Sequence, residues 1–393
     1  MRFFKSKFKL VYESAITYPA PLNLSYNYNF GISAFCILML QIITGIFLVM
    51  YYCPNSLIAF SSVEHIMRDI PYGWLIRYLH ANGASFFFIM VYGHICRAFT
   101  YGSFVFPRRL LWCSGVLILL LMIITAFLGY VLPWGQMSYW AATVITNLAS
   151  TIPLLGQKIV YWLWSGFSVD NPTLNKFFSL HYILPFAILG LVLIHFALLH
   201  QTGSSNPLGP RFFQDSIPFH PFYTLKDTLS VIIMIFFLVM VVTFAPNYLG
   251  HPDNYIPANP DSTPEHIVPE WYFLPFYAIL RSIPNKSLGV LALVASIVVL
   301  FLLPFIVRPK VRNVLFKPMT LIYNQLFIAN CIVLGFIGQS PLQEPFLSLG
   351  RASTLLYFLY FVFLTVVEYL DYSMVSSIKK TDNKKYKKYI EFS

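Results

Sequence analysis

Two pairs of histidines have the same spacing inside apolar segments. His80 and His94 are fourteen residues apart, and so are His181 and His195. In a helix, fourteen residues span ~21 Å along the axis and bring both side chains to one face. A lone histidine at membrane depth is most simply a hydrogen-bonded core residue. Four histidines in this pattern instead indicate two bis-imidazole metal sites at two depths.

The helices that carry these histidines are predicted to run in the same direction. The segment 74–100 leads into a basic connection, and the segment 176–200 follows a long loop on the opposite side. His80 should therefore lie level with His181, and His94 with His195. Bis-imidazole ligation without thiolate or carboxylate suits a low-spin haem iron that transfers electrons. A zinc ion needs ligands that converge on one point, and a dimetal centre needs two points ~4 Å apart. The two histidines of each helix are ~21 Å apart, which excludes both kinds of centre.

Glycines repeat with the same period as the histidines. Gly31 and Gly45 in the first apolar segment are fourteen residues apart, as are Gly115 and Gly129 in the third. Small residues at two depths let the flanking backbones approach the edges of flat porphyrins. A non-redox transporter that uses the histidines for protons or ions is the alternative, but it does not explain the glycines.

Two arginines lie one helical turn from the histidines. Arg77 precedes His80 by three residues, and Arg97 follows His94 by three. Each guanidinium is then closer to water than the imidazole, at the level where haem propionates would point.

The composition is that of a polytopic membrane protein. Of 393 residues, 58% are hydrophobic and 10% are charged, and apolar runs of about 20 residues recur, each long enough to cross a bilayer. The five cysteines have no paired spacing, which indicates neither a disulfide framework nor a thiolate metal site. We expect an all-α integral membrane protein with eight transmembrane helices, the first four forming a haem-binding bundle. Their predicted ranges are 30–52, 74–100, 111–132, 176–200, 225–245, 288–307, 319–338 and 350–371.

The chain divides into four predicted parts. Residues 1–29 are a basic interfacial segment that we expect to be retained, and 30–210 form the four-helix bundle with a loop at 133–175. Residues 211–371 form a second four-helix part that includes the loop 246–287, and 372–393 are a basic, solvated tail.

The charges predict the orientation. An even number of helices leaves both termini on one side, which we call the inner side. Nineteen of the 26 Lys and Arg residues fall on that side, so the positive-inside rule puts both termini on the cytoplasmic or matrix face. The loops 133–175 and 246–287 then lie on the outer side.

Over nearly its whole length the sequence resembles the cytochrome b family of respiratory quinol–cytochrome c reductases. The segments that carry the resemblance are "RYLHANGASFFF", "GYVLPWGQMSYWAATVITNL", "HQTGSSNPLG", "KD" at 226–227 and "PEWYFLPFYAILRSIPNK". The plastid relative is split into two chains and spaces its second histidine pair one residue wider, so this chain fits the respiratory branch better. By resemblance, Arg97 and Trp112 hold the propionates of the inner haem and Arg77 those of the outer haem.

The resemblance implies a function and a setting. Two b-type haems, the outer of low and the inner of high potential, would link ubiquinol oxidation outside to quinone reduction inside in a proton-translocating Q cycle. The implied partners are a Rieske iron–sulfur protein, a membrane-anchored c-type cytochrome, other complex III subunits, lipids and a second copy of the chain, with no nucleic acid. The implied location is the mitochondrial inner membrane, with both termini in the matrix. A plastid-type plastoquinol enzyme is the closer alternative.

The outer loop supplies a candidate quinol site. Glu270 lies among apolar and aromatic residues in "PEWYF", where desolvation favours its protonated form, and such a carboxyl can accept a proton from a hydroquinone. A simply solvated loop carboxylate is the alternative. By resemblance, Glu270 is the quinol ligand and proton acceptor, Tyr277 helps to position the substrate, and a short helix at 137–149 forms the opposite wall.

The inner side supplies a candidate quinone site. His200 lies five residues beyond His195, and Lys226 and Asp227 begin the fifth helix on the same side. These groups can deliver protons to a quinone, although the residues alone favour an interfacial anchor for His200 and a helix cap for Asp227. By resemblance, His200 and Asp227 serve quinone reduction, with Ser204 nearby.

Three residues depart from the family pattern. Ala141 replaces a usual glycine in "SYWAA", which adds a methyl group to the quinol pocket wall. We expect weaker binding of methoxyacrylate-type inhibitors with turnover largely intact; full sensitivity in an inhibition titration would contradict this position of Ala141. Gln201 stands where an acidic residue often follows the inner-site histidine, and Tyr28 where tryptophan is common.

Overall fold

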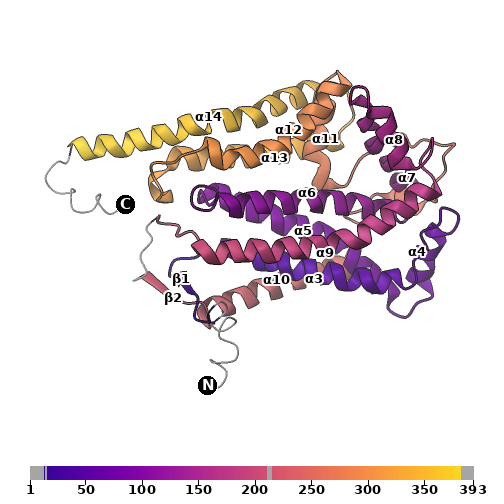
Figure 1. Cartoon of the computed structure of the whole chain (residues 1–393), viewed down its shortest axis with the longest axis horizontal. Helices are drawn as coiled ribbons and strands as arrows, with labels where there is room; N and C mark the ends of the chain where they lie inside the picture. The colour runs from indigo at the N-terminus through magenta and orange to yellow at the C-terminus, as the bar shows by residue number, and fades with distance from the viewer. Residues whose placement is uncertain (1–12, 14–15, 210–214, 382–393) are drawn as a thin grey trace.

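The computed structural model describes residue 13 and residues 16–209 and 215–381. Figure 1 shows long helices side by side along the longest dimension of the molecule, with short helices gathered at one end. The short helices are α4 (Ala59–Arg68), α7 (Gln136–Asn147) and α8 (Gly156–Trp164). The opposite end carries the antiparallel strands β1 (Pro19–Pro21) and β2 (Ser216–Pro218). Both loops predicted to lie on the outer side are therefore at the end remote from the strands.

The first four long helices form the predicted bundle. They are α3 (Phe30–Val49), α5 (Gly73–Thr100), α6 (Arg109–Val131) and α9 (Asn171–Thr202), and α3 packs on α5 while α6 packs on α9. Helix α9 begins five residues before its predicted start at 176. The cause is a capping box, in which Asp170 and Thr173 satisfy each other's backbone N–H groups, with Pro172 in the first turn.

The remaining long helices pack on two opposite sides of the bundle (Figure 1). Helix α10 (Phe222–Phe244) packs on α5 and α3. A second group packs together and meets the bundle through α12 against α6 and α13 against α5. Its members are α11 (Leu274–Ser282), α12 (Lys286–Ile306), α13 (Pro318–Gln339) and α14 (Phe346–Thr381). The segment predicted as a tail from 372 is thus helical as far as Thr381, and 382–393 lie outside the described residues.

The prediction of an all-helical membrane protein is confirmed. Within the described residues, seven helical segments are long and apolar enough to cross a membrane. Helix α5 has the length, with 28 residues, but is not among the seven because polar side chains such as Arg77, Asn82 and His94 lower its hydropathy. The count of eight therefore stays a prediction.

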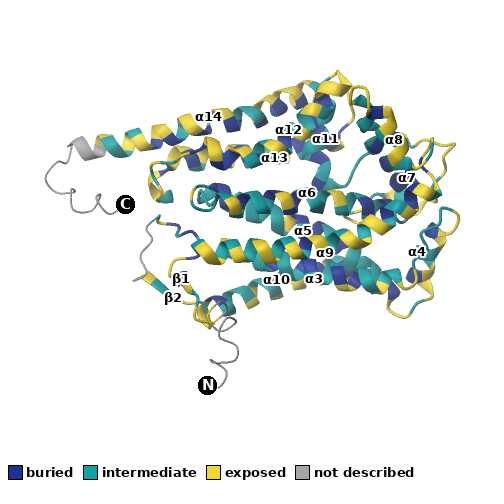
Figure 2. Ribbon diagram, viewed as in Figure 1, coloured by how far each residue is buried: buried dark blue, intermediate teal, exposed yellow. Residues whose placement is uncertain are grey.

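The outward faces of the long helices are apolar. Figure 2 shows exposed residues along the outer surface of α10 and α14, and on α10 these include Ile232, Phe236 and Phe237, each more than half exposed. Large apolar surfaces of this kind are unfavourable in water. They fit a lipid environment or contact with other membrane subunits.

Candidate functional site

The four histidines form two pairs across the bundle. The ring centres of His80 and His181 are 6.2 Å apart, and those of His94 and His195 are 6.4 Å apart. The first residue of each pair comes from α5 and the second from α9, so these helices are parallel. A metal ion bonded on opposite sides by two imidazoles at about 2.0 Å would separate ring centres by roughly 6 Å. The described geometry fits one iron between the members of each pair.

The outer pair uses its Nδ1 atoms for hydrogen bonds. His181 donates from Nδ1 to the carbonyl oxygen of Thr125 at 2.8 Å, and His80 Nδ1 lies 2.9 Å from the Thr44 hydroxyl. A metal-bound histidine usually spends its other nitrogen in this way, which fixes the ring and its tautomer. Nε2 of each ring is then left for a ligand in the centre of the bundle.

The inner pair is held less symmetrically. His195 Nδ1 lies 2.8 Å from the Ser114 hydroxyl, whereas His94 Nδ1 lies 3.3 Å from Nη2 of Arg97. A guanidinium can only donate, so this contact keeps the His94 proton on Nε2. An iron at Nε2 therefore requires Arg97 to turn away from His94.

Each of the four predicted glycines faces an imidazole. A Cβ atom would lie close to the ring Cε1 of one histidine, at 3.2 Å for Gly31 with His94, Gly45 with His80 and Gly115 with His195, and at 2.4 Å for Gly129 with His181. The sequence analysis assigned the glycines to porphyrin edges; the structure adds that they let each imidazole lie against the neighbouring helix.

The polar partners of the imidazoles were missed in the sequence analysis. Thr44 and Ser114 directly precede Gly45 and Gly115, so a hydroxyl next to each glycine was the available signal. The carbonyl of Thr125 carried no such signal, because every residue has a backbone carbonyl. Only the packing of α9 on α6 shows which one is used.

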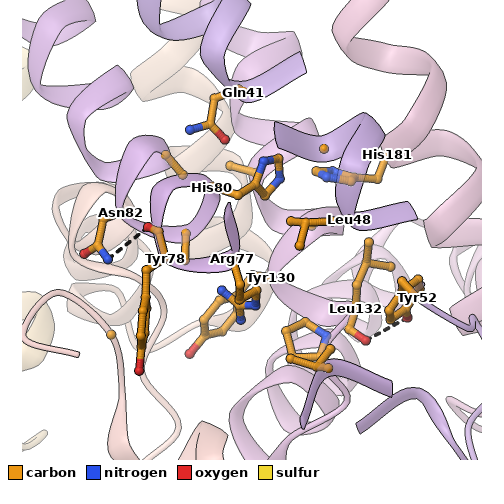
Figure 3. A pocket seen from close by; sticks show the side chains of 18 of the residues that line it. Gln41, Leu48, Tyr52, Arg77, Tyr78, His80, Asn82, Tyr130, Leu132 and His181 are labelled. Carbon is orange, nitrogen blue, oxygen red and sulfur yellow. Dashed lines mark hydrogen bonds between the residues drawn. The ribbon is translucent and has the colours of Figure 1, made fainter. Parts of the chain in front are cut away.

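A cavity of about 590 Å³ joins the outer histidine pair to the loop that carries Glu270. Figure 3 shows His80 and His181 on its walls, with Arg77 and Tyr130 nearby. Both Gly45 and Gly129 also line it. One continuous space therefore contains the candidate outer haem site and the candidate quinol site.

Glu270 has a carboxyl whose pKa lies near neutral pH. Burial raises its pKa to about 7, against the opposing influence of Tyr130 and the positive charge of Arg77. The residue precedes the short helix η6 (Trp271–Phe273), whose Tyr272 is buried and also lines the cavity. A carboxyl with this pKa can hold or release a proton near neutral pH.

Two other residues assigned to the outer site do not line the cavity. The Tyr277 hydroxyl donates to the carbonyl of Ile267 at 3.1 Å, and the Tyr277 ring lies under Arg281. Ala141 is buried within α7. Tyr130 and Pro133, at and just beyond the end of α6, do line the cavity, and the wall predicted at 137–149 stays a prediction.

The inner candidates lie around the end of α9 and the start of α10. His200 is exposed and Asp227 is half-buried, and no hydrogen bond joins them within the described residues. Lys226 donates to the carbonyl of Leu24 at 2.7 Å and lies over the ring of Tyr26. The N-terminal segment therefore approaches both α9 and α10, a contact that the sequence analysis did not predict.

The roles predicted for Trp112 and Ser204 on the inner side stay predictions. Trp112 gives its only donor, the indole N–H, to the carbonyl of Leu300 at 2.6 Å, so that group does not face the inner histidines. The hydroxyl of Ser205 lies 2.8 Å from the hydroxyl of Ser103. Arg97 in turn donates to the Ser103 hydroxyl at 3.2 Å. No hydrogen bond from the neighbouring Ser204 is found in the described part of the chain.

No group of three or more His, Cys, Asp or Glu side chains converges on one point in the described residues. The family model described as "Cytochrome b/b6/petB" matches residues 15–203, and "Cytochrome b(C-terminal)/b6/petD" matches residues 257–358. The chain belongs to the cytochrome b family. The two matches cover the histidine pairs and the Glu270 loop.

Individual cytochromes b agree over most of the chain. Cytochrome b of Chondrus crispus is 54% identical over 91% of this chain and 94% of its own length. Cytochrome b of Arabidopsis thaliana is 56% identical over 88% of both chains. A solved chain of a hyperthermophilic respiratory complex III has a TM-score of 0.89 at 34% identity and covers 95% of this chain and 99% of its own. Membership of the cytochrome b family implies haem cofactors.

Proposed function

We propose that this cytochrome b is the di-haem, quinone-binding subunit of a respiratory complex III. Ubiquinol is oxidised at the outer cavity, and quinone is reduced at the inner end of α9. One electron leaves through an iron–sulfur protein and then a membrane-anchored c-type cytochrome, and the other crosses the bundle. Because protons leave on the outer side and are taken up on the inner side, this Q cycle builds a protonmotive force.

The observation that carries the proposal is the pair of matched imidazole sites. His80 with His181 would hold the outer haem and His94 with His195 the inner haem, with a separation of ~21 Å along the helices. When bound, the two haems supply one-electron transfer between the membrane faces. The glycines opposite the rings and the engaged Nδ1 atoms support this ligand set.

The outer cavity supports oxidation of a hydroquinone. Glu270 accepts a proton from the substrate hydroxyl, and its pKa of about 7 allows it to release that proton to the outer water. Arg77 lies in the cavity wall, where its positive charge would pair with a propionate of the outer haem. The same charge favours the ionised form of Glu270.

The inner end supports reduction of a quinone. His200 and Asp227 supply the protons, and Lys226 helps to hold the N-terminal segment beside them. Arg97 would hold a propionate of the inner haem and release Nδ1 of His94, which would leave Nε2 of His94 as a ligand. Its bond to Ser103 keeps the guanidinium at this level.

The same proposal implies an oligomeric state and a location in the cell. We infer a homodimeric complex in the mitochondrial inner membrane, with both termini in the matrix and other complex III subunits and lipids covering the apolar perimeter.

A reduced-minus-oxidised spectrum of the purified complex tests the proposal. We expect the narrow α-bands of two b haems, and loss of the inner band alone in His94→Leu. Bands that persist unchanged in His94→Leu would contradict the ligand set. A preparation with no α-band would indicate the transporter alternative, and turnover with plastoquinol but not ubiquinol would indicate the plastid-type enzyme.

A further inference from the structure

Tyr18 packs against His200 at the inner end of the bundle. The two ring centres are 4.8 Å apart, and the ring planes are inclined by 42°. Tyr18 precedes β1 in the N-terminal segment, whereas His200 lies in the last turn of α9. This contact therefore joins a segment outside the bundle to the side chain proposed to serve the inner quinone.

The backbone of Tyr18 is held by strand pairing. Its carbonyl oxygen accepts from the N–H of Phe219 at 2.9 Å, and the carbonyl of Ile16 accepts from the N–H of His220 at 3.1 Å. These bonds continue the β1–β2 pairing, in which Pro19 lies opposite Pro218. The strand β2 precedes α10, so the same pairing fixes Tyr18 relative to the helix that carries Asp227.

The far end of the Tyr18 ring is enclosed by the turn after α9. A Cβ atom at Gly203 would lie 3.4 Å from the Tyr18 hydroxyl, and Gly203 has a φ of +71°. The Gly203 carbonyl accepts from Nε of Arg108 at 2.9 Å, which holds this turn in position. The hydroxyl is buried, with no hydrogen-bond partner among the described residues, and burial raises the pKa of Tyr18. The ring cannot leave His200 unless this turn or the strands move.

His200 has few other restraints. It is exposed, and among the described residues no side chain forms a hydrogen bond with its ring. Fixing a free side chain in one rotamer costs conformational entropy. A flat ring held rigidly against the imidazole lowers that cost, because it removes alternative orientations before the substrate arrives.

We propose that Tyr18 is a positioning residue for quinone reduction, whose ring holds the His200 imidazole in the orientation that delivers a proton to the quinone. This rests on the proposed function, in which His200 serves the inner site. Reduction of one quinone to quinol takes two electrons from the bundle and two protons. One proton comes from His200, which is reprotonated from the inner water, and the other from Asp227. Tyr18 transfers no proton, since its hydroxyl is enclosed.

The test removes the ring in the assembled complex. With the outer site blocked by an inhibitor, decylubiquinol reduces the inner haem by the reverse of the inner reaction, and the initial rate gives kcat and KM. We expect Tyr18→Leu to lower kcat by roughly three- to tenfold, the value of one aromatic contact, with a smaller change in KM. Tyr18→Phe retains the ring and should stay within about twofold of the unmodified complex.

A double-mutant cycle separates positioning from structural support. In a His200→Gln background, Tyr18→Leu should have less than about twofold further effect, because the side chain it positions is gone. Tyr223→Phe is the matched control: its hydroxyl donates to the carbonyl of Pro21, so its loss loosens the same segment without touching His200. Any effect of Tyr223→Phe should be the same in both backgrounds.

Three results would overturn the inference: an unaltered kcat in Tyr18→Leu, an equal loss with and without His200, or a loss in Tyr18→Phe as large as that in Tyr18→Leu. If Tyr18→Leu does not assemble, Tyr18→Met supplies a longer, flexible side chain without a flat ring and carries the same expectation. The unmodified complex shows whether a negative result concerns the proposed function or only the role of Tyr18. Absence of quinol-driven haem reduction there overturns the proposed function and this inference together, whereas normal reduction with no effect of Tyr18 overturns this inference alone.

Discussion

Each imidazole of the bundle is restrained by two features of its neighbours, a polar partner and a glycine. For His80 these are Thr44 and Gly45, consecutive residues of α3. The partner fixes which nitrogen carries the proton, and the glycine fixes how closely the ring approaches the helix. For His80, His181 and His195 both restraints exist before any ligand binds, so these rings are preorganised, whereas His94 first requires Arg97 to turn away.

Gly129 has the tightest contact and gives the sharpest test of this arrangement. A methyl group there would lie 2.4 Å from Cε1 of His181, compared with 3.2 Å for Gly115 and His195. We expect Gly129→Ala to displace His181 and reduce outer haem content at least twofold, with a smaller effect of Gly115→Ala on the inner haem. Haem per protein, resolved by α-band, measures this. Gly190→Ala on α9 is the control, since nothing lies within 4 Å of that Cβ. Equal loss in all three variants would argue against the contact.

Glu270 predicts a pH dependence at the outer site. Its pKa is raised to about 7, so the carboxyl is protonated below that pH and can act as a base only above it. Quinol oxidation through the outer site should therefore rise between pH 6 and pH 8. Glu270→Gln should lose this rise and slow oxidation by roughly tenfold or more. The control Glu265→Gln changes a side chain that is 92% exposed on the same loop. A pH profile that survives in Glu270→Gln would assign the titration to another group.

At the scale of elements, α13 and α14 are joined by a buried polar cluster at the inner end. Asp371 is fully buried and accepts from the backbone N–H groups of Met319 and Thr320, at 3.0 and 2.9 Å, and from the Thr320 hydroxyl at 2.6 Å. It therefore caps the first turn of α13 from a neighbouring helix. Beside it, Lys317 donates to the buried carboxylate of Glu368.

Removing this cap should destabilise the packing of α13 on α14. Asp371→Ala leaves two backbone N–H groups and a hydroxyl without partners, which costs roughly 2 kcal/mol or more. We expect a lower midpoint of thermal unfolding for the purified complex, with haem spectra unchanged at low temperature. Ser373→Ala, whose hydroxyl only contacts the Leu370 carbonyl on its own helix, is the matched control. If both variants unfold at the temperature of the unmodified complex, the cap contributes nothing measurable.

Local patterns predicted the elements well and the long-range contacts poorly. The long helices and the level pairing of His80 with His181 followed from hydropathy and from the helical repeat. The hydrogen bond from Trp112 to the Leu300 carbonyl was not predicted, because Leu300 lies on a helix far away in sequence. The contact of Tyr18 with His200 was missed for the same reason: strand pairing between β1 and β2 creates it, and three-residue strands give almost no sequence signal.

At the scale of the whole molecule, the two ends of the structure differ in character. One end gathers the short helices and the Glu270 loop, and the other gathers β1, β2 and the end of α14 (Figure 1). The sequence analysis placed most Lys and Arg residues on the inner side, among them the cluster from Arg308 to Lys317. This inner side corresponds to the end that carries β1 and β2. The structure is thus compatible with one orientation in which the cavity beside Glu270 lies at the end away from the basic side.

Protease accessibility in oriented membranes tests this orientation. The positive-inside rule predicts that the basic end faces the matrix, because moving lysines and arginines across the bilayer during insertion is costly. In mitoplasts, whose inner membrane is intact, protease should cut the outer loop 246–287 and spare an epitope tag fused after Ser393. After the membrane is opened with detergent, the tag should be lost as well. Cleavage of the tag in intact mitoplasts would reverse the orientation, and it would move the proton release proposed for Glu270 to the matrix side.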